Sequence, residues 1–182
     1  PITTVALINE KRAEVIERIG AACRAGKQVY WVCTLIEDSD ELEAEAAETI
    51  TQQLRIALPD LFIGLVHGRM KASEKAAQMA AFKAQATQLL VATTVIEVGV
   101  DVPNASIMVI EQAERFGLAQ LHQLRGRVGR GARESSCVLL YDLPLSDTAQ
   151  QRLDILRKSD DGFEIAEKDL ELRGGGDPLG LK

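Results

Sequence analysis

Aromatic residues make up only 4% of this 182-residue sequence, with four Phe, two Tyr and one Trp. Valine, isoleucine, leucine and alanine must therefore fill most of the core. Hydrophobic residues total 46% and charged residues 26%, which is ordinary for a globular protein. A chain of this length suits one compact domain with a small appendage.

Cysteine and histidine are scarce as well. The three cysteines form no CxxC pair, and there are only two histidines. We therefore expect neither a disulfide framework nor a metal site. No apolar run approaches the roughly 18 residues of a membrane span, and no signal peptide is recognisable. These absences predict a cytoplasmic protein with no membrane partner.

Negative charge predominates, with a net charge of −6 and a pI of about 5.1. Taken alone, this balance argues weakly against nucleic-acid binding. The charge is unevenly distributed, because Glu37–Glu48 holds seven acidic side chains and Arg125–Arg133 holds four arginines. A basic site can therefore lie on an acidic body, and the acidic run is interpreted as a solvated helix face.

Short apolar runs alternate with amphipathic stretches from residue 5 to residue 142. The apolar runs predict six strands, at Val5–Ile8, Gln28–Thr34, Phe62–His67, Leu89–Thr94, Ser106–Glu111 and Cys137–Asp142. Helical spacing predicts helices at Glu10–Ala25, Asp40–Leu58, Ala72–Lys83 and Leu118–Arg125. This alternation predicts an α/β fold, in which a mostly parallel sheet has helices on both faces.

No strand is predicted after Pro144. Ser146–Lys158, with Ser146 as its N-cap, and Phe163–Arg173 are predicted as two helices that form a hairpin. The glycine-rich tail Gly174–Lys182 is predicted as loop. The expected organisation is an α/β domain over residues 1–145 and a helical hairpin with its tail over residues 146–182.

The sharpest motif is Gln123-Leu-Arg-Gly-Arg-Val-Gly-Arg130, in which glycines and arginines recur at intervals of three. Glycine lets the backbone approach a ligand closely, and the guanidinium fork suits phosphate oxygens. A helical turn would put Arg127 and Arg130 on one side. The structural alternative is a solvated basic helix end. We disfavour it because each glycine inside a helix costs about 1 kcal/mol.

Two further segments follow predicted strands and are therefore candidates for a site at the carboxyl ends of a parallel sheet. Thr93–Pro103 closes a strand with two threonines and continues to Asp101, which can accept hydrogen bonds from a ribose. Ordinary turn chemistry at a strand end is the alternative reading of this segment. His67-Gly-Arg-Met70 is weaker, because a histidine at a strand end is more often a structural hydrogen-bonder than a catalyst.

A phosphate-binding loop GxxxxGK[ST] is missing, and so is a DExH or DEAD box. The chain thus has arginines suited to phosphate but no phosphate cradle, which is the pattern of an arginine finger supplied across an interface. Its first residue is Pro1 rather than methionine. We therefore expect the chain to belong to a longer protein that supplies the phosphate loop.

At these residues the sequence resembles superfamily 2 helicases. Gln123–Arg130 is similar to motif VI (QxxGRxGR), Thr93–Pro103 to motif V, and Gln28–Leu35 to motif IV. The stretches Thr93–Ala105 and Gly117–Arg130 closely resemble the RecG branch of DNA helicases. The hairpin with Asp169-Leu-Glu-Leu-Arg-Gly174 is similar to that family's translocation motif. The resemblance extends over nearly the whole chain and implies a second RecA-like motor lobe.

The resemblance implies a role for each matching residue. It implies that Arg127 and Arg130 reach the ATP γ-phosphate, that Gln123 joins this contact, and that Gly99 and Asp101 approach the ribose. Thr93, Gly68 and Arg69 would grip the DNA backbone. ATP and Mg²⁺ would be bound mainly by a first lobe, so this chain would be inactive alone.

The family's activity is ATP-driven translocation on duplex DNA, which remodels stalled forks and branched recombination intermediates. The implied partners are branched or forked DNA and, in the same full-length chain, the first RecA-like lobe and a wedge domain. A monomer in the bacterial cytoplasm, with the nucleoid, is expected.

The tail departs from the family, since Pro178 replaces an apolar residue and no glutamine-bearing loop follows. We therefore expect a truncated translocation element. Two alternatives remain at this stage. One is the translocase lobe of a transcription-repair coupling factor, which shares motif VI and the hairpin. The other is a non-catalytic adaptor that binds nucleic acid without ATP.

Overall fold

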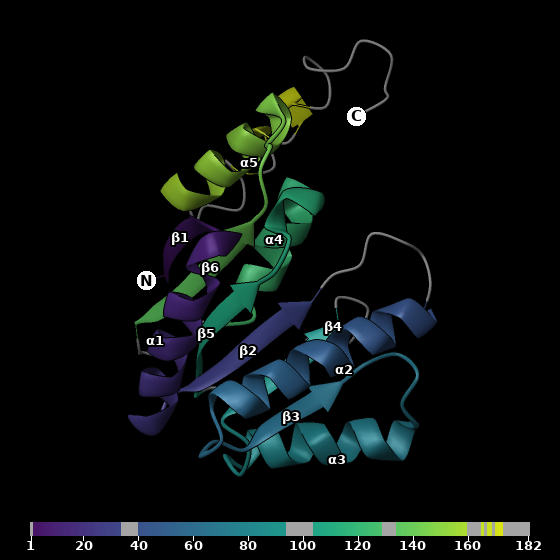
Figure 1. The fold of residues 1–182 in the computed structure, drawn as a ribbon. Helices are drawn as coiled ribbons and strands as arrows, with labels where there is room; N and C mark the ends of the chain where they lie inside the picture. Colours follow the sequence, from purple (N-terminus) through teal and green to yellow (C-terminus); the bar gives the residue numbers. More distant parts are fainter. Residues whose placement is uncertain are drawn as a thin grey trace.

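The computed structural model describes residues 2–33, 40–93, 104–128 and 134–159, together with 165, 167, 168 and 170–172. Within these residues six strands form one parallel sheet in the order β1-β6-β5-β2-β4-β3 (Figure 1). The strands are β1 (Ile2–Ile8), β2 (Gln28–Cys33), β3 (Ile63–Val66), β4 (Leu89–Thr93), β5 (Ala105–Ile110) and β6 (Ser135–Tyr141).

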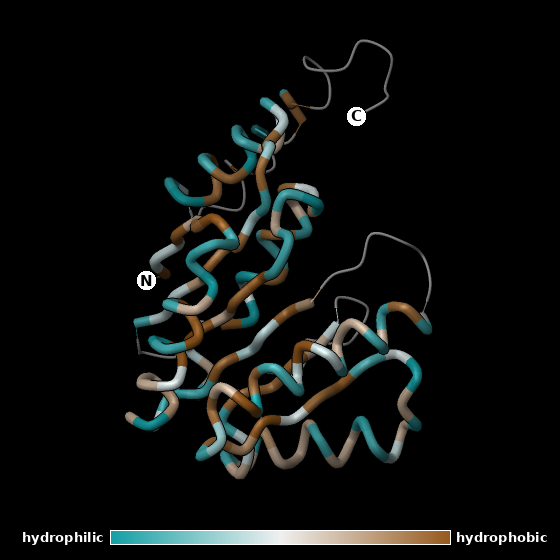
Figure 2. The backbone as a smooth tube through the Cα atoms, viewed as in Figure 1, coloured by the Kyte–Doolittle hydropathy of each residue, from teal (hydrophilic) through white to brown (hydrophobic). Residues whose placement is uncertain are grey.

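Five α-helices and two short 3-10 helices are complete within the described residues, and they connect and cover the strands. They are η1 (Asn9–Lys11), α1 (Arg12–Arg24), α2 (Asp40–Ala57), α3 (Ala72–Lys83), η2 (Ala113–Arg115), α4 (Leu118–Arg125) and α5 (Asp147–Lys158). Figure 2 shows hydrophobic segments along the strands and helices in which hydrophobic and hydrophilic residues alternate. The predicted α/β class, a parallel sheet between helical layers, is confirmed.

Two apolar cores lie on opposite faces of the sheet because successive side chains of a strand point to opposite sides. Trp31 of β2 joins the core beneath α1 and α2, whereas its neighbour Tyr30 joins the core that α3, α4 and α5 cover. Tyr30 meets Phe82 of α3 edge-to-face, with ring centroids 4.9 Å apart. Every residue of β2 is buried, as its nearly unbroken apolar sequence predicts for a central parallel strand.

Most predicted elements have boundaries within one or two residues of those observed. The bounds of α3 and α4 are as predicted, and Ser146 caps α5, its Oγ accepting a hydrogen bond from the Ala149 amide at 3.0 Å. The prediction for β1 was wrong at its start, because the strand begins at Ile2 rather than Val5. Parallel pairing of Ile2 with Ser135 of β6 extends it through two threonines that local hydropathy cannot assign.

The second helix of the predicted hairpin is described only in part. Residues 165, 167, 168 and 170–172 are helical, and Ile165 is buried in the core that contains Leu153 and Leu156 of α5. The hairpin side therefore shares a core with the sheet. The boundary at residues 145/146 stays a prediction, and the tail from residue 173 lies outside the described residues.

Strand β3 lies at one end of the sheet, and helix side chains occupy its open edge. Arg55 of α2 donates to the Ile63 carbonyl at 2.8 Å, and Gln78 Oε1 of α3 accepts from the Leu65 amide at 3.1 Å. Unpaired groups on an edge strand are a template for pairing with another chain. These two bonds therefore protect the edge at Ile63 and Leu65.

We expect Gly64→Ala to destabilise the chain by roughly 1–3 kcal/mol, the usual range for overpacking. A Cβ at residue 64 would lie 2.7 Å from Gln78 Oε1 and 3.1 Å from Leu90 Cδ1, so the amide that caps Leu65 must move. Urea unfolding measures the loss. Gly68→Ala is the matched control, because its Cβ would meet no atom within 4 Å; equal losses in the two variants would contradict the expectation.

Candidate functional site

The carboxyl ends of the parallel strands bring two of the predicted segments together. Val66 of β3 pairs with Ala92 of β4, so His67 and Thr93 are the next residues on neighbouring strands. The turn after β3 and the segment after β4 therefore leave the sheet side by side. This is the edge at which open α/β sheets bind ligands.

Gly68 and Arg69 form the exposed tip of a tight turn. The Met70 amide donates to the His67 carbonyl at 3.3 Å and closes the turn around them. Both residues are exposed, and α3 begins just beyond at Ala72. Gly68 has open space where a Cβ would lie, so packing within the described residues does not require glycine there. Close approach of a ligand is a physical reason for it.

Thr93 ends β4 with a fully buried side chain. Its hydroxyl has no hydrogen-bond partner within the described part of the chain. An unpaired buried hydroxyl costs about 1–3 kcal/mol. The threonine does not reach the surface in this conformation, so its contact with DNA stays a prediction. Gly99, Asp101 and Arg130 lie outside the described residues.

Helix α4 and the turn after it hold the two remaining predicted site residues that the structure describes, Gln123 and Arg127. Leu118, Leu121 and Leu124 bury one side of the helix, whereas Gln123 is exposed on another. The helix ends at Arg125, and Arg127 lies in the following turn, its amide donating to the Leu124 carbonyl at 3.0 Å. Gly126 is the C-cap rather than an interior residue, so the helical penalty assumed for it does not apply.

Arg125 is a structural residue that sequence reasoning did not separate from its neighbours. Its guanidinium, only 2% exposed, donates to Thr4 Oγ1 at 3.1 Å, to the Leu156 carbonyl at 2.6 Å and to the Ser159 carbonyl at 2.8 Å. These partners belong to β1 and to the C-terminal end of α5, where carbonyl groups attract a cation. The arginine therefore ties α4 to two other elements.

A second buried network follows β5. The Trp31 indole donates to Glu111 Oε2 at 2.7 Å, and Arg12 donates to Glu111 Oε1. Arg12 also lies over the Trp31 ring, 5.3 Å from its centroid, and burial lowers its pKa. The carboxylate is thus fixed just before Gln112, which has a positive φ of 50° and starts the path to α4. No sequence motif marks this network, because its residues are far apart in the chain.

The cysteines are packing residues. Burial raises the pKa of Cys23 to about 11 and that of Cys33 and Cys137 to about 12, so each is a neutral thiol at pH 7. Among the described residues no group of three His, Cys, Asp or Glu side chains is placed to hold a metal ion. Within the same residues no helix is long and apolar enough to cross a membrane.

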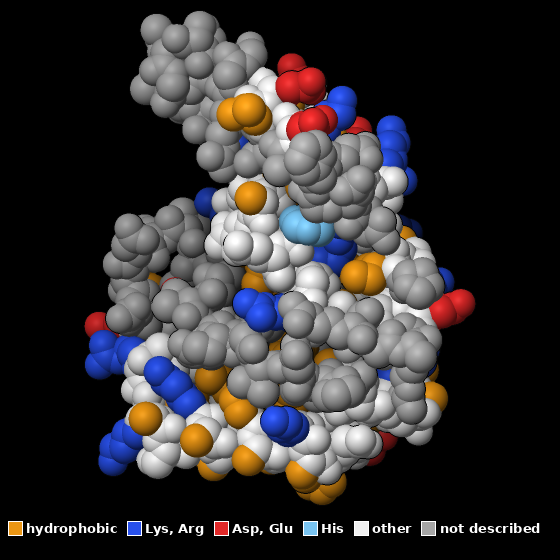
Figure 3. All heavy atoms as spheres, turned by 180° about the vertical axis from the view of Figure 1, so that it is seen from behind, with side chains coloured by type: hydrophobic (Ala, Val, Ile, Leu, Met, Phe, Trp, Pro, Cys, Tyr) orange, Lys and Arg blue, Asp and Glu red, His pale blue; other side chains and the backbone are white. Residues whose placement is uncertain are grey.

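Helices α3 and α2, which cover opposite faces of the sheet, differ in charge. The turn after β3 and helix α3 hold Glu74 against four basic residues, Arg69, Lys71, Lys75 and Lys83. Figure 3 views the molecule from behind and shows Lys and Arg side chains across the lower half of that face. On the opposite face, α2 has acidic residues in its first half. The basic site expected at Arg125–Arg133 stays a prediction, because Arg125 is buried and Arg130 and Arg133 lie outside the described residues.

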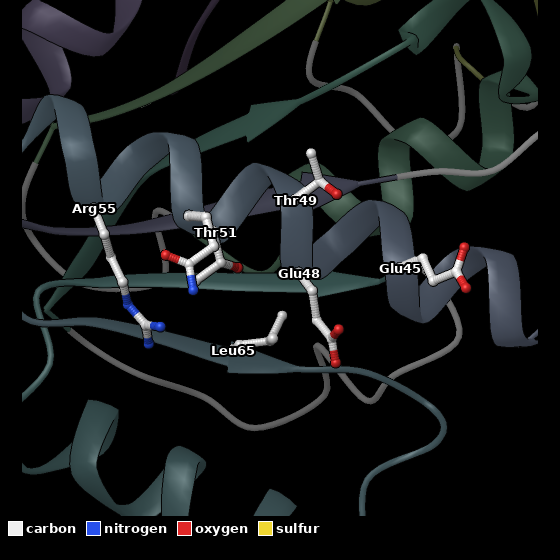
Figure 4. A pocket seen from close by; sticks show the side chains of 7 residues that line it. Glu45, Glu48, Thr49, Thr51, Arg55 and Leu65 are labelled. Atoms are coloured by element: carbon white, nitrogen blue, oxygen red, sulfur yellow. The ribbon is translucent and has the colours of Figure 1, made fainter.

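A cavity of about 450 Å³ lies between α2 and β3, and its lining includes Glu45, Glu48, Thr51, Arg55 and Leu65. Figure 4 shows Glu48 and Arg55 extending from α2 toward β3. None of the lining residues was a predicted site residue. The cavity touches the predicted site through Glu48, whose carboxylate lies 3.3 Å from His67 Nε2.

Comparison with known proteins places these features in a family. The chain is 64% identical to the ATP-dependent DNA helicase RecG of Escherichia coli K12, over all of this chain and 26% of that protein. It is 58% identical to RecG of Acidithiobacillus ferridurans, over 27% of that protein. The chain thus spans about a quarter of the length of these relatives.

Solved structures agree with the sequence relatives. A structure of RecG bound to a three-way DNA junction matches the whole chain and 24% of its own, with a TM-score of 0.80 and 41% identity. The C-terminal domain of the DEAD-box protein Dbp5, at 15% identity and a TM-score of 0.60, matches 86% of this chain and 82% of its own, and supports the fold alone. The family described as helicase conserved C-terminal domain matches residues 10–132, more than half of the chain. The resemblance to RecG helicases is thereby confirmed, and the chain belongs to the helicase conserved C-terminal domain family.

Proposed function

We propose that this chain is the second motor lobe of a RecG-type ATP-dependent DNA helicase. In the full-length protein it would help to drive translocation on duplex DNA, and so remodel stalled forks and branched recombination intermediates. The observation that carries this proposal is 64% identity to E. coli RecG across the whole chain. The structural match to RecG on a three-way junction supports branched DNA as the substrate.

On the nucleotide side, Arg127 and Arg130 would act as arginine fingers toward ATP. Exposed Gln123 and the position of Arg127 just beyond α4 support this role, because both lie where a facing lobe could reach them. Gly99 and Asp101 would approach the ribose. The bound ATP, with Mg²⁺ held mainly by the first lobe, supplies the phosphate bond whose hydrolysis drives the motor.

On the DNA side, Gly68 and Arg69 would contact the phosphate backbone, with Thr93 next to them on the neighbouring strand. The exposed turn leads to α3, whose N-terminus is capped by Glu74, because Glu74 Oε1 accepts a hydrogen bond from the Lys71 amide at 3.1 Å. Arg69 adds a fixed positive charge, and Gly68 lets a phosphate come close to the main chain. Two features that favour an anion thus lie together after β3.

The proposed partners follow from this role. The first RecA-like lobe would face α4, and a wedge domain of the same chain would engage the branch point. The protein would act as a monomer in the bacterial cytoplasm, with the nucleoid. The hairpin that starts with α5 would pass lobe closure on to duplex DNA.

We expect the full-length protein to separate a labelled three-way DNA junction when both ATP and Mg²⁺ are present. Native gels with and without each component measure this activity. ATP hydrolysis on DNA without junction separation would favour the transcription-repair translocase instead. Junction binding that ATP does not affect, with no hydrolysis, would favour the non-catalytic adaptor.

A further inference from the structure

We propose that His67 is a positioning residue that holds the Gly68–Arg69 turn in the shape that meets DNA phosphate. This inference rests on the proposed contact between that turn and the DNA backbone. It assigns a function to a histidine that sequence reasoning treats as an ordinary structural hydrogen-bonder. The His67 side chain is 7% exposed, whereas the two residues after it are exposed.

Both ring nitrogens of His67 have directional partners. The Arg69 amide donates to Nδ1 at 3.2 Å, and Nε2 lies 3.3 Å from Glu48 Oε1. A backbone amide can only donate, so Nδ1 is the unprotonated nitrogen of the ring. Nε2 therefore has the proton and donates to Glu48. The ring links helix α2 on one side to the turn on the other.

The main chain of His67 completes the arrangement. Its amide donates to Met70 Sδ at 3.4 Å, and its carbonyl accepts from the Met70 amide at 3.3 Å. The turn is therefore closed by bonds from His67 at its start. The hydrogen bond from the Arg69 amide to the His67 ring sets the direction of Arg69.

The two ring bonds make different contributions. The bond to Nδ1 fixes the turn itself. The bond to Glu48, whose side chain is 60% exposed at the rim of the cavity beside α2 (Figure 4), fixes the ring and is open to water. An exposed contact of this kind is worth little. The Nδ1 acceptor is therefore the essential atom for positioning.

Substitutions at His67 separate this role from simple packing. In His67→Asn, the side-chain oxygen occupies the Nδ1 position and can accept from the amide two residues on, as asparagine does in turns. In His67→Gln, the amide group reaches the Nε2 position instead. Gln fills the buried volume better than Asn does. If His67 acts only through packing, His67→Gln should preserve junction affinity better than His67→Asn. If it positions the turn, His67→Asn should preserve junction affinity better.

The experiment measures junction affinity by fluorescence anisotropy in the full-length helicase. We expect His67→Asn to bind within about twofold of wild type, and His67→Gln and His67→Ala to bind roughly five- to tenfold more weakly, since one orienting bond is lost. Glu48→Gln keeps an acceptor for Nε2 and should change affinity less than twofold. The proposal would be overturned if His67→Gln bound the junction as tightly as His67→Asn. It would also be overturned if all three substitutions at His67 weakened binding equally.

Two further measurements distinguish a failure of this proposal from a failure of the proposed function. They are junction binding by Arg69→Ala and hydrogen exchange in the turn. If Arg69→Ala leaves affinity and its salt dependence unchanged, the DNA contact of the turn is wrong. Exchange of residues 67–71, followed by mass spectrometry, still tests the positioning. Faster exchange in His67→Gln than in His67→Asn is expected, and equal exchange in both would refute the role of Nδ1.

Discussion

Replacing Arg130 with alanine in the full-length helicase should lower junction-stimulated ATP turnover at least a thousandfold while junction binding persists. An arginine finger stabilises charge on the transferred phosphoryl group and contributes about 10³–10⁵ in rate. It does so only when the two lobes close, so its loss should leave the proposed DNA contacts of the turn after β3 largely intact. Steady-state phosphate release and fluorescence anisotropy measure the two quantities separately.

Arg24→Ala is a suitable control for that experiment. Its guanidinium is half-exposed, pairs with Asp60 at 2.7 Å, and ends α1 far from the carboxyl edge of the sheet. Turnover in this variant should stay close to wild type. If Arg130→Ala also keeps its turnover, motif VI does not act on the nucleotide in this protein. The non-catalytic adaptor would then become the better interpretation.

Replacing Arg125 with alanine should lower the free energy of unfolding of the chain by about 3–5 kcal/mol, the range for breaking a buried charged network. The change deletes the donors to the Thr4 hydroxyl and to the Leu156 and Ser159 carbonyls, of which the contacts to Thr4 and Leu156 are buried. Urea unfolding followed by circular dichroism measures the loss.

A matched arginine on α5 provides the comparison. Arg157 is half-exposed and pairs only loosely with Asp154 at 3.5 Å, so Arg157→Ala should cost less than about 1 kcal/mol. Arg125→Lys should restore part of the loss at most, because an ammonium lacks the planar fork that reaches several acceptors. A cost below 1 kcal/mol for Arg125→Ala would indicate that water replaces the arginine without penalty.

The fold was predictable because its signals are local. Alternating apolar runs and helical stripes identify the strands and helices, and completely buried strands such as β2 indicate a parallel sheet. The order of strands was not predicted, since β1 pairs with β6 more than 130 residues away. That pairing also decides where β1 begins, which no local pattern records.

For the candidate site, the sequence predicted only residues that lie within recognisable motifs. The turn at Gly68 follows the carboxyl end of β3 as expected, and Gln123 is exposed on α4, but their contacts with ligands stay predictions. Arg125 and Arg127 look alike in the sequence, yet one is buried in a structural network and the other lies in a turn. Only tertiary packing separates them, because burial depends on which distant carbonyls surround each guanidinium.

The bonds from Arg55 and Gln78 to β3 also restrict how a neighbouring domain can attach at this end of the sheet. With the Ile63 carbonyl and the Leu65 amide already bonded, a second domain would have to break these two bonds to continue the ladder of backbone hydrogen bonds there. It must dock through side chains and loops, as at other interfaces between domains of one chain, where relative motion is the rule. In the proposed motor, a sheet continued across two lobes would resist the separation that each cycle requires, and the bonded edge of β3 would keep that joint reversible.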